Sequence, residues 1–105
     1  MLEALGNNRR VLGEVIELFL ENAPPLLAEL RSAVAMGDDR RTARIAHRLR
    51  GSVAQFSNGE VKDSLTRLEH MAQAGDIREA PAELRRMESA LTSLIRAMRT
   101  YRLRE

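Results

Sequence analysis

The chain has 105 residues, a length that suits one domain with a single modest core. Hydrophobic residues make up 44% of it and aromatic residues only 3%, so the core must be aliphatic, and the absence of cysteine excludes disulfides and thiolate metal sites. The formal charge is only +2, the sequence holds no membrane-length apolar run and the N-terminus lacks a signal-peptide pattern, so we expect a cytoplasmic domain without membrane contact.

Apolar periodicity and helix-breaking residues divide the chain into five predicted helices. Pro24 and Pro25 are expected to separate the first two of them, because proline lacks the N–H that a helix interior needs but is tolerated where a helix starts. In chain order, the predicted helices cover about residues 8–22, 25–36, 39–58, 60–74 and 80–103.

Glycines and aspartates mark the predicted helix boundaries. Three glycines each follow an apolar run, as glycines at helix C-termini do: Gly37, Gly59 and Gly75. The aspartates that follow can cap the next helix by accepting backbone N–H bonds: Asp38 or Asp39, and Asp76. Pro81 is expected in the first turn of the last helix, after a turn over residues 77–79.

The last predicted helix carries apolar residues spaced by three and four, which is typical of a bundle or a coiled coil. These residues are Leu84, Met87, Leu91, Leu94, Met98 and Tyr101. We interpret them as a seam within one molecule, because the repeat is short for an independent coiled coil. The predicted fold is all-α: an antiparallel up-and-down four-helix bundle with a short additional N-terminal helix.

The third predicted helix carries a histidine on its outer side. On a helical wheel its apolar residues fall within about 60° of one direction, which must face the core, while His47 points about 160° away from Leu49. Gly51 lies near His47, although glycine in mid-helix costs about 0.5–1 kcal/mol relative to alanine. A side chain at position 51 would either crowd the imidazole or keep another surface from approaching it.

The charge around His47 suits a phosphoryl acceptor. Arg44, Arg48 and Arg50 favour a neutral, nucleophilic imidazole and would stabilise an anion placed on it. Arg50 lies one turn further on and can reach a phosphoryl oxygen with its fork of donors. The sequence holds neither a glycine-rich phosphate loop nor a carboxylate pair suited to Mg²⁺, so a partner must bring the metal and the activated phosphate.

The run Ala46-His47-Arg48-Leu49-Arg50-Gly51-Ser52 resembles the AHxLKGS signature of histidine-containing phosphotransfer domains of phosphorelays. The likeness extends to the order of residues 16–52 and, more weakly, to Leu68-Glu69 and Ala74-Gly75-Asp76. It implies a four-helix bundle in which His47 accepts phosphate from an aspartyl phosphate on one receiver domain and passes it to another. No bound cofactor is implied, and Mg²⁺ is expected on the receiver.

The resemblance also implies roles for the residues around His47. Arg50 matches the basic position, usually Lys, that contacts the phosphoryl group, and Gly51 matches the glycine that keeps the histidine accessible. The residues expected to dock a receiver are Ala43, Arg44, Arg48, Ala54 and Gln55. We expect a monomer, and we leave open whether residues 1–105 stand alone or belong to a larger hybrid sensor kinase.

Three alternatives remain open. A bundle of this fold could dock receivers or other proteins without carrying phosphate. The phosphoacceptor bundle of a histidine kinase fits less well, because that family has an acid after its histidine, where Arg48 stands here. Nucleic-acid binding through the arginine clusters is disfavoured by the near-balanced charge and scarce aromatics. No autonomous kinase activity is expected, and whether the protein acts as an enzyme stays open.

Overall fold

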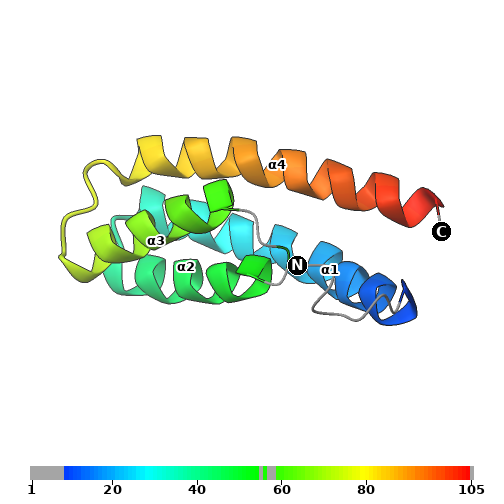
Figure 1. Ribbon diagram of the computed structural model, residues 1–105. Coiled ribbons are helices and arrows are strands. Elements are labelled where there is room, and N and C mark those ends of the chain that lie inside the picture. The colour runs from blue at the N-terminus through cyan, green and yellow to red at the C-terminus, as the bar shows by residue number, and fades with distance from the viewer. Residues whose placement is uncertain (1–8, 55, 57–58, 105) are drawn as a thin grey trace.

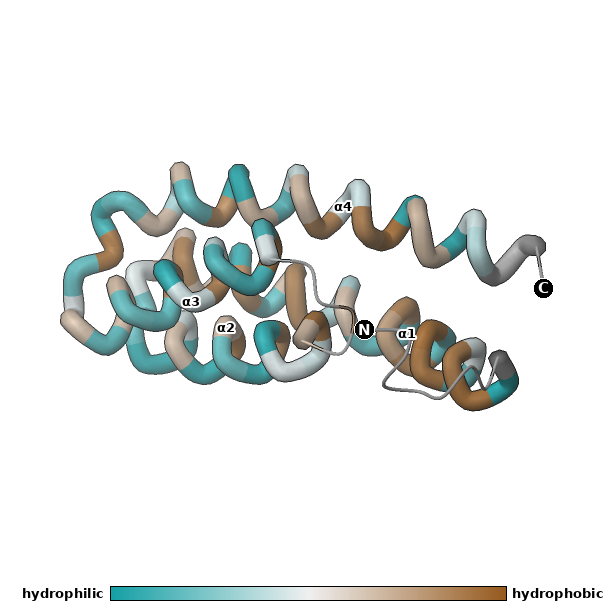
Figure 2. Tube along the Cα trace, in the orientation of Figure 1, coloured by the Kyte–Doolittle hydropathy of each residue, from teal (hydrophilic) through white to brown (hydrophobic). Residues whose placement is uncertain are grey.

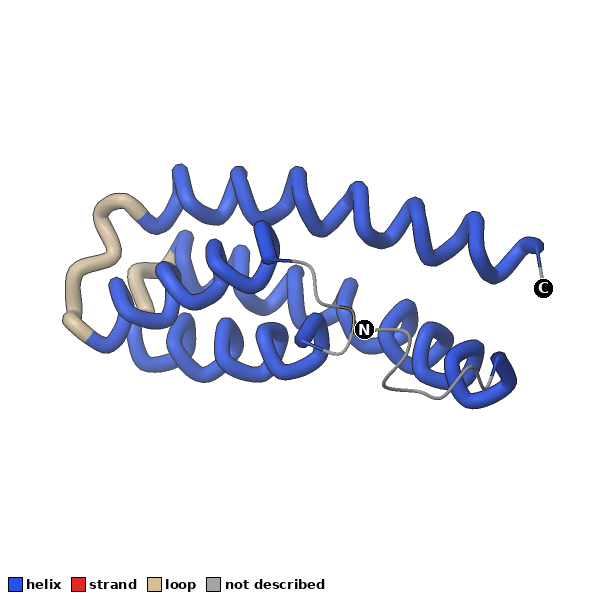
Figure 3. The backbone as a smooth tube through the Cα atoms, in the orientation of Figure 1, coloured by secondary structure: helices blue, strands red, loops and turns tan. Residues whose placement is uncertain are grey.

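Four helices account for nearly all of the computed structural model, which describes residues 9–54, 56 and 59–104. They are α1 (Arg9–Ala35), α2 (Asp39–Ala54), α3 (Gly59–Gln73) and α4 (Ala80–Arg104) (Figure 1). Helices that follow one another in the chain run in opposite directions through short connections (Figure 3). Because α2 packs on α1 and α3, and α4 packs on α3 and α1, the four helices form a closed bundle. The predicted all-α bundle of four antiparallel helices is confirmed.

The prediction of a separate, short N-terminal helix is wrong for the described residues. The two segments expected on either side of Pro24 and Pro25 form one continuous helix, α1, with both prolines inside it. The reason is the apolar stripe on its inner face, which keeps its spacing of three and four across the prolines: Ile16, Phe19, Ala23, Leu26 and Leu30 are all buried. The prolines themselves are exposed, so two missing backbone bonds are outweighed by core packing that stays in phase.

Two of the three predicted helix-ending glycines are confirmed. Gly37 and Gly75 adopt φ values of 68° and 71°, the left-handed conformation that glycine allows, and their N–H groups bond back to Val34 and Ala72. Gly59 is instead the first residue of α3. The glycine prediction was therefore wrong there, because an apolar run before a glycine does not distinguish the end of one helix from the start of the next.

Of the two candidate caps for α2, Asp38 is the one used: its Oδ1 accepts the Arg41 N–H at 3.1 Å. Asp76 does not cap α4, which begins four residues later at Ala80. Its carboxylate instead binds Arg78 within the connecting turn. Pro81 lies in the first turn of α4, as predicted.

The core is aliphatic and runs the length of the bundle. Figure 2 shows apolar residues recurring along the inner side of each helix, including the ends of α1 and α4 that extend past α2 and α3. The predicted seam of α4 is confirmed, with four of its residues buried and two partly buried: Leu84, Met87, Leu91 and Met98, then Leu94 and Tyr101. Val11, near the start of α1, is exposed. Each described helix also lacks the long apolar stretch that a membrane crossing requires.

Glu83 is one of two acidic residues that are buried among the described residues, and it joins α4 to α3. Its carboxylate accepts hydrogen bonds from the Arg67 guanidinium at 3.0 and 3.1 Å, and Arg67 also reaches Ser64. Burial alone would raise the pKa of the Glu83 carboxyl, but the hydrogen bonds from Arg67 and Ser64 outweigh it and lower that pKa. Glu83 is therefore ionised and compensated in the folded protein.

We expect Glu83→Gln to lower the free energy of unfolding at neutral pH by about 1–2 kcal/mol, because it removes a charge-assisted pair of hydrogen bonds. Because folding lowers the pKa of Glu83, its contribution is complete above the ordinary value of 4.5 and is lost as the pH falls through the folded value. Urea unfolding at pH 7 and at pH 3 measures the loss of stability at neutral pH and its disappearance in acid. A difference between wild type and Glu83→Gln as large at pH 3 as at pH 7 would contradict this assignment, and Glu21→Gln, at an exposed position of α1, is the matched control.

Candidate functional site

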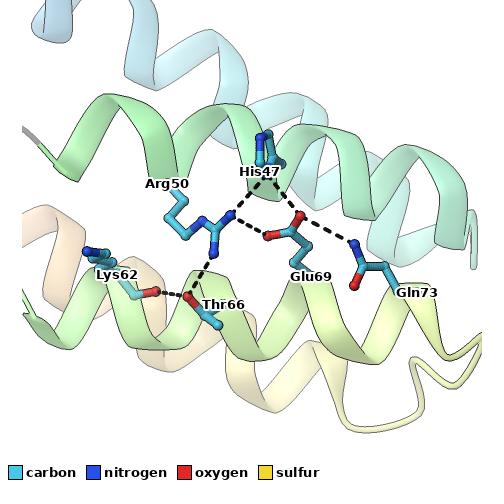
Figure 4. A network of polar contacts seen from close by, with 6 residues as sticks. All are labelled: His47, Arg50, Lys62, Thr66, Glu69 and Gln73. Atoms are coloured by element: carbon cyan, nitrogen blue, oxygen red, sulfur yellow. Dashed lines mark hydrogen bonds and ion pairs between the residues drawn. The ribbon is translucent and has the colours of Figure 1, made fainter.

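The site lies where one line of α2 side chains faces one line of α3 side chains (Figure 4). Spacings of four, three and four residues keep side chains on one line of a helix. On α2 the line comprises Ala43, His47, Arg50 and Ala54, and on α3 it comprises Lys62, Thr66, Glu69 and Gln73. The sequence places His47 on the outer side of its helix, and the structure adds that this side borders α3.

His47 combines an exposed ring with one anchored nitrogen. Its side chain is 63% exposed, and its Nδ1 lies 2.9 Å from Oε2 of Glu69, whose side chain is only 10% exposed. A carboxylate can only accept a hydrogen bond, so this contact assigns the ring hydrogen to Nδ1. In the neutral ring Nε2 then carries the free lone pair, which makes Nε2 the nucleophilic atom.

Arg50 supplies the second charge beside Glu69. Its Nη2 lies 3.2 Å from Glu69 Oε1 and 3.1 Å from His47 Nδ1. Because Nδ1 already donates to Glu69, it cannot also accept a hydrogen from Arg50, so the guanidinium is held by the carboxylate rather than by the ring. Glu69 Oε1 is buried and makes no hydrogen bond among the described residues, which leaves the Arg50 charge as its compensation.

Thr66 and Gln73 complete the contacts of this group. The Thr66 hydroxyl donates to the Lys62 carbonyl at 2.9 Å and accepts from Arg50 Nη1 at 3.5 Å. The Gln73 amide donates to Glu69 Oε2 at 3.5 Å. His47 and Arg50 of α2 therefore meet a polar row of α3 whose central member is the buried carboxylate.

Gly51 is exposed, and a Cβ at this position would meet nothing within 4 Å. Of the two explanations for this glycine, crowding of the imidazole by a Cβ is therefore wrong. The remaining explanation is that glycine leaves room for another molecule to approach. That role remains a prediction.

The residues predicted to dock a partner do not all lie on one side of α2. Arg44, Arg48 and Ala54 are exposed and Ala43 is half-buried, while Gln55 lies outside the described residues. Arg48 instead lines a groove of about 510 Å³ between α1 and α2, on the side of α2 away from Arg50, together with Asn22, Pro25, Leu26, Glu29 and Ser52.

 Within the described part of the chain, no hydrogen bond or ion pair joins Arg44 or Arg48 to the imidazole.

Glu69 is the site residue that sequence reasoning missed. In the sequence it belongs only to the weaker part of the family likeness, which assigns no role to Glu69, Thr66 or Gln73. A signal was present, because Glu69 stands between the apolar positions Leu68 and Ala72 and lies four residues before Gln73 on one helix line. The other histidine, His70, is exposed in the last turn of α3. The described residues include no cluster of three His, Asp or Glu side chains able to hold a metal ion.

Comparison with known proteins gives a family and a fold. Residues 14–100 match the model of the Hpt domain. The crystal structure of histidine-containing phosphotransfer protein B (HptB) from Pseudomonas aeruginosa PAO1 superposes with a TM-score of 0.91 at 19% sequence identity, covering 99% of this chain and 90% of that one. At this identity the likeness concerns the fold. The search of curated proteins gave no significant match.

We expect Gly51→Ala to raise the free energy of unfolding by about 0.5–1 kcal/mol, because alanine restricts the unfolded chain and a methyl group at this site meets no neighbour. Urea unfolding monitored by circular dichroism measures the change. The reverse exchange in the same helix, Ala43→Gly, should lower the stability. A destabilised Gly51→Ala variant would mean that the glycine serves the fold rather than access to His47.

Proposed function

The chain belongs to the Hpt domain family, and from this we propose that His47 is the phosphoacceptor of a phosphorelay. In this proposal His47 takes a phosphoryl group from the aspartyl phosphate of one receiver domain and passes it to another receiver. The observation that carries the proposal is the pairing of an exposed imidazole with a buried carboxylate at Nδ1, which leaves Nε2 as the nucleophile.

The transfer uses the two ring nitrogens for different tasks. The Nε2 lone pair attacks phosphorus and forms an N–P bond, while the P–O bond to the receiver's aspartate breaks. The electrons of that P–O bond stay on the aspartate, which leaves as a carboxylate. Nε2 carries no proton that could leave, so the ring gains a positive charge in this step. Its Nδ1–H already points at the Glu69 carboxylate, so the charge that develops on the imidazole is stabilised at 2.9 Å.

Arg50 is proposed to stabilise the phosphoryl group. A guanidinium offers several donors in a fixed fork and stays charged, which suits the equatorial oxygens of a transferring phosphoryl group. Its Nη2 lies within 3.1 Å of the His47 ring, so a short movement of a long side chain would bring it to a group on Nε2.

The partner is proposed to supply the rest of the chemistry. A receiver domain would bring the aspartyl phosphate and the Mg²⁺, while this chain would contribute the nucleophile and one cation. Arg44 and Arg48 are exposed on the same helix, where they would attract the anionic site of a receiver, and Gly51 would let that site come close. We propose no cofactor bound by this chain.

We expect the domain to acquire base-stable, acid-labile phosphate when it is incubated with a phosphorylated receiver and Mg²⁺, and His47→Gln to acquire none. His70→Gln, at the exposed histidine of α3, is the matched control and should be labelled like the wild type. Radiolabel transfer resolved on a gel measures this. Label that persists in His47→Gln would overturn the assignment, and a wild type that binds receivers without being labelled would favour a docking-only role.

We expect Arg50→Ala to slow transfer to His47 by about tenfold or more, because it removes a charge-assisted contact to the phosphoryl group. Rapid-quench measurement of the transfer rate from a phosphorylated receiver tests this. Arg85→Ala, at an exposed arginine of α4, controls for the loss of one positive charge. Equal rates in Arg50→Ala and wild type would remove Arg50 from the mechanism.

A further inference from the structure

Arg50 is held on one side of the imidazole, and the phosphoryl group is proposed to arrive on the other. Its Nη2 lies beside Nδ1 and Glu69, whereas the nucleophilic lone pair is on Nε2. Nδ1 and Nε2 point away from each other in the ring plane. The guanidinium must therefore leave its position beside Glu69, at least in part, to contact a phosphoryl group on Nε2.

Thr66 is the neutral residue that holds Arg50 in this position. Its hydroxyl hydrogen is used by the Lys62 carbonyl at 2.9 Å, so the oxygen can only accept from Arg50 Nη1, which lies at 3.5 Å. Thr66 is half-buried, and the Arg50 side chain is 29% exposed, so water competes only partly for this contact. Thr66 thus binds Nη1 of Arg50, while Glu69 attracts Nη2.

We propose that Thr66 is a positioning residue that retains Arg50 beside Glu69 in the unphosphorylated protein. When His47 is phosphorylated, Arg50 exchanges its contact with Thr66 for one with the phosphoryl group. The inference rests on the proposed function. Glu69 tolerates the exchange because phosphorylation makes the ring cationic and leaves its Nδ1–H on the carboxylate. The compensation of the buried charge passes from Arg50 to His47.

One consequence separates this role from a merely structural one. The Thr66 contact stabilises only the unphosphorylated domain, so its loss must move the phosphotransfer equilibrium toward phosphohistidine. Because the contact is long, at 3.5 Å, it lies at the weak end of the range for hydrogen bonds and predicts a change of about two- to fivefold in the equilibrium constant. Loss of a residue that positions Arg50 for transfer would move the equilibrium the other way.

The test compares Thr66→Val with wild type in the equilibrium between His47 and a receiver charged with acetyl phosphate. We expect the ratio of phosphorylated domain to phosphorylated receiver to rise about two- to fivefold in Thr66→Val. Thr66→Ser keeps the hydroxyl and should match wild type. Thr100→Val is the matched control, because the Thr100 hydroxyl also donates to the carbonyl four residues back but lies exposed on α4.

A second comparison shows whether Thr66 acts through Arg50. In an Arg50→Ala background, Thr66→Val should leave the equilibrium unchanged. An unchanged or reversed equilibrium in Thr66→Val alone, or the same shift without Arg50, would overturn the inference while leaving the phosphoacceptor role of His47 intact.

A partner-free measurement keeps the two proposals apart. The side-chain ¹⁵N resonances of Arg50 in the unphosphorylated protein should move in Thr66→Val and stay in place in Thr66→Ser. A wild type that no receiver labels would defeat the proposed function, and the resonances would still decide whether Thr66 holds Arg50. Resonances that do not respond to Thr66→Val would overturn the inference that Thr66 holds Arg50.

Discussion

The buried carboxylate of Glu69 is the constraint on which the site depends. A charge removed from water must be compensated at close range, because an unpaired ion in the interior is strongly unfavourable. The compensation comes from α2, through His47 and Arg50, so the packing of α2 on α3 and the chemistry of the imidazole depend on the same contacts. A rotation of α2 by one residue would remove both partners from Glu69 at once.

α3 is the element that connects this site to the rest of the bundle. Its Glu69 faces α2, while its Arg67, two residues earlier, reaches across to the buried Glu83 of α4. The apolar positions between these lines fill the core. An ion pair therefore holds α3 on each side: α3 contributes the acid toward α2 and the base toward α4. The position of Glu69 beside His47 is thus set by the whole bundle rather than by one contact.

Much of the fold and the outer side of α2 could be predicted from sequence, because both follow from local periodicity. The wheel of α2 places Leu49 inward and His47 outward, and the structure agrees. The continuity of α1 was missed because prolines were given more weight than the apolar stripe that passes through them in phase. Glu69 was missed for a different reason: its burial depends on which face of α3 meets α2, and periodicity within one helix does not contain that information.

The arginine at position 50 gains meaning from the same geometry. The related signature usually has lysine there, and lysine would carry the charge alone. The guanidinium divides its contacts between two nitrogens, with Nη2 beside Glu69 and Nη1 beside Thr66. The single ammonium of a lysine has no such planar pair of nitrogens and could not make both contacts in the same way. Arginine also has more donors than these two contacts use. The substitution thus retains the charge that the phosphoryl group requires and adds a second attachment to α3, so that the resting position of the cation is defined by the helix pair rather than by the side chain's own flexibility.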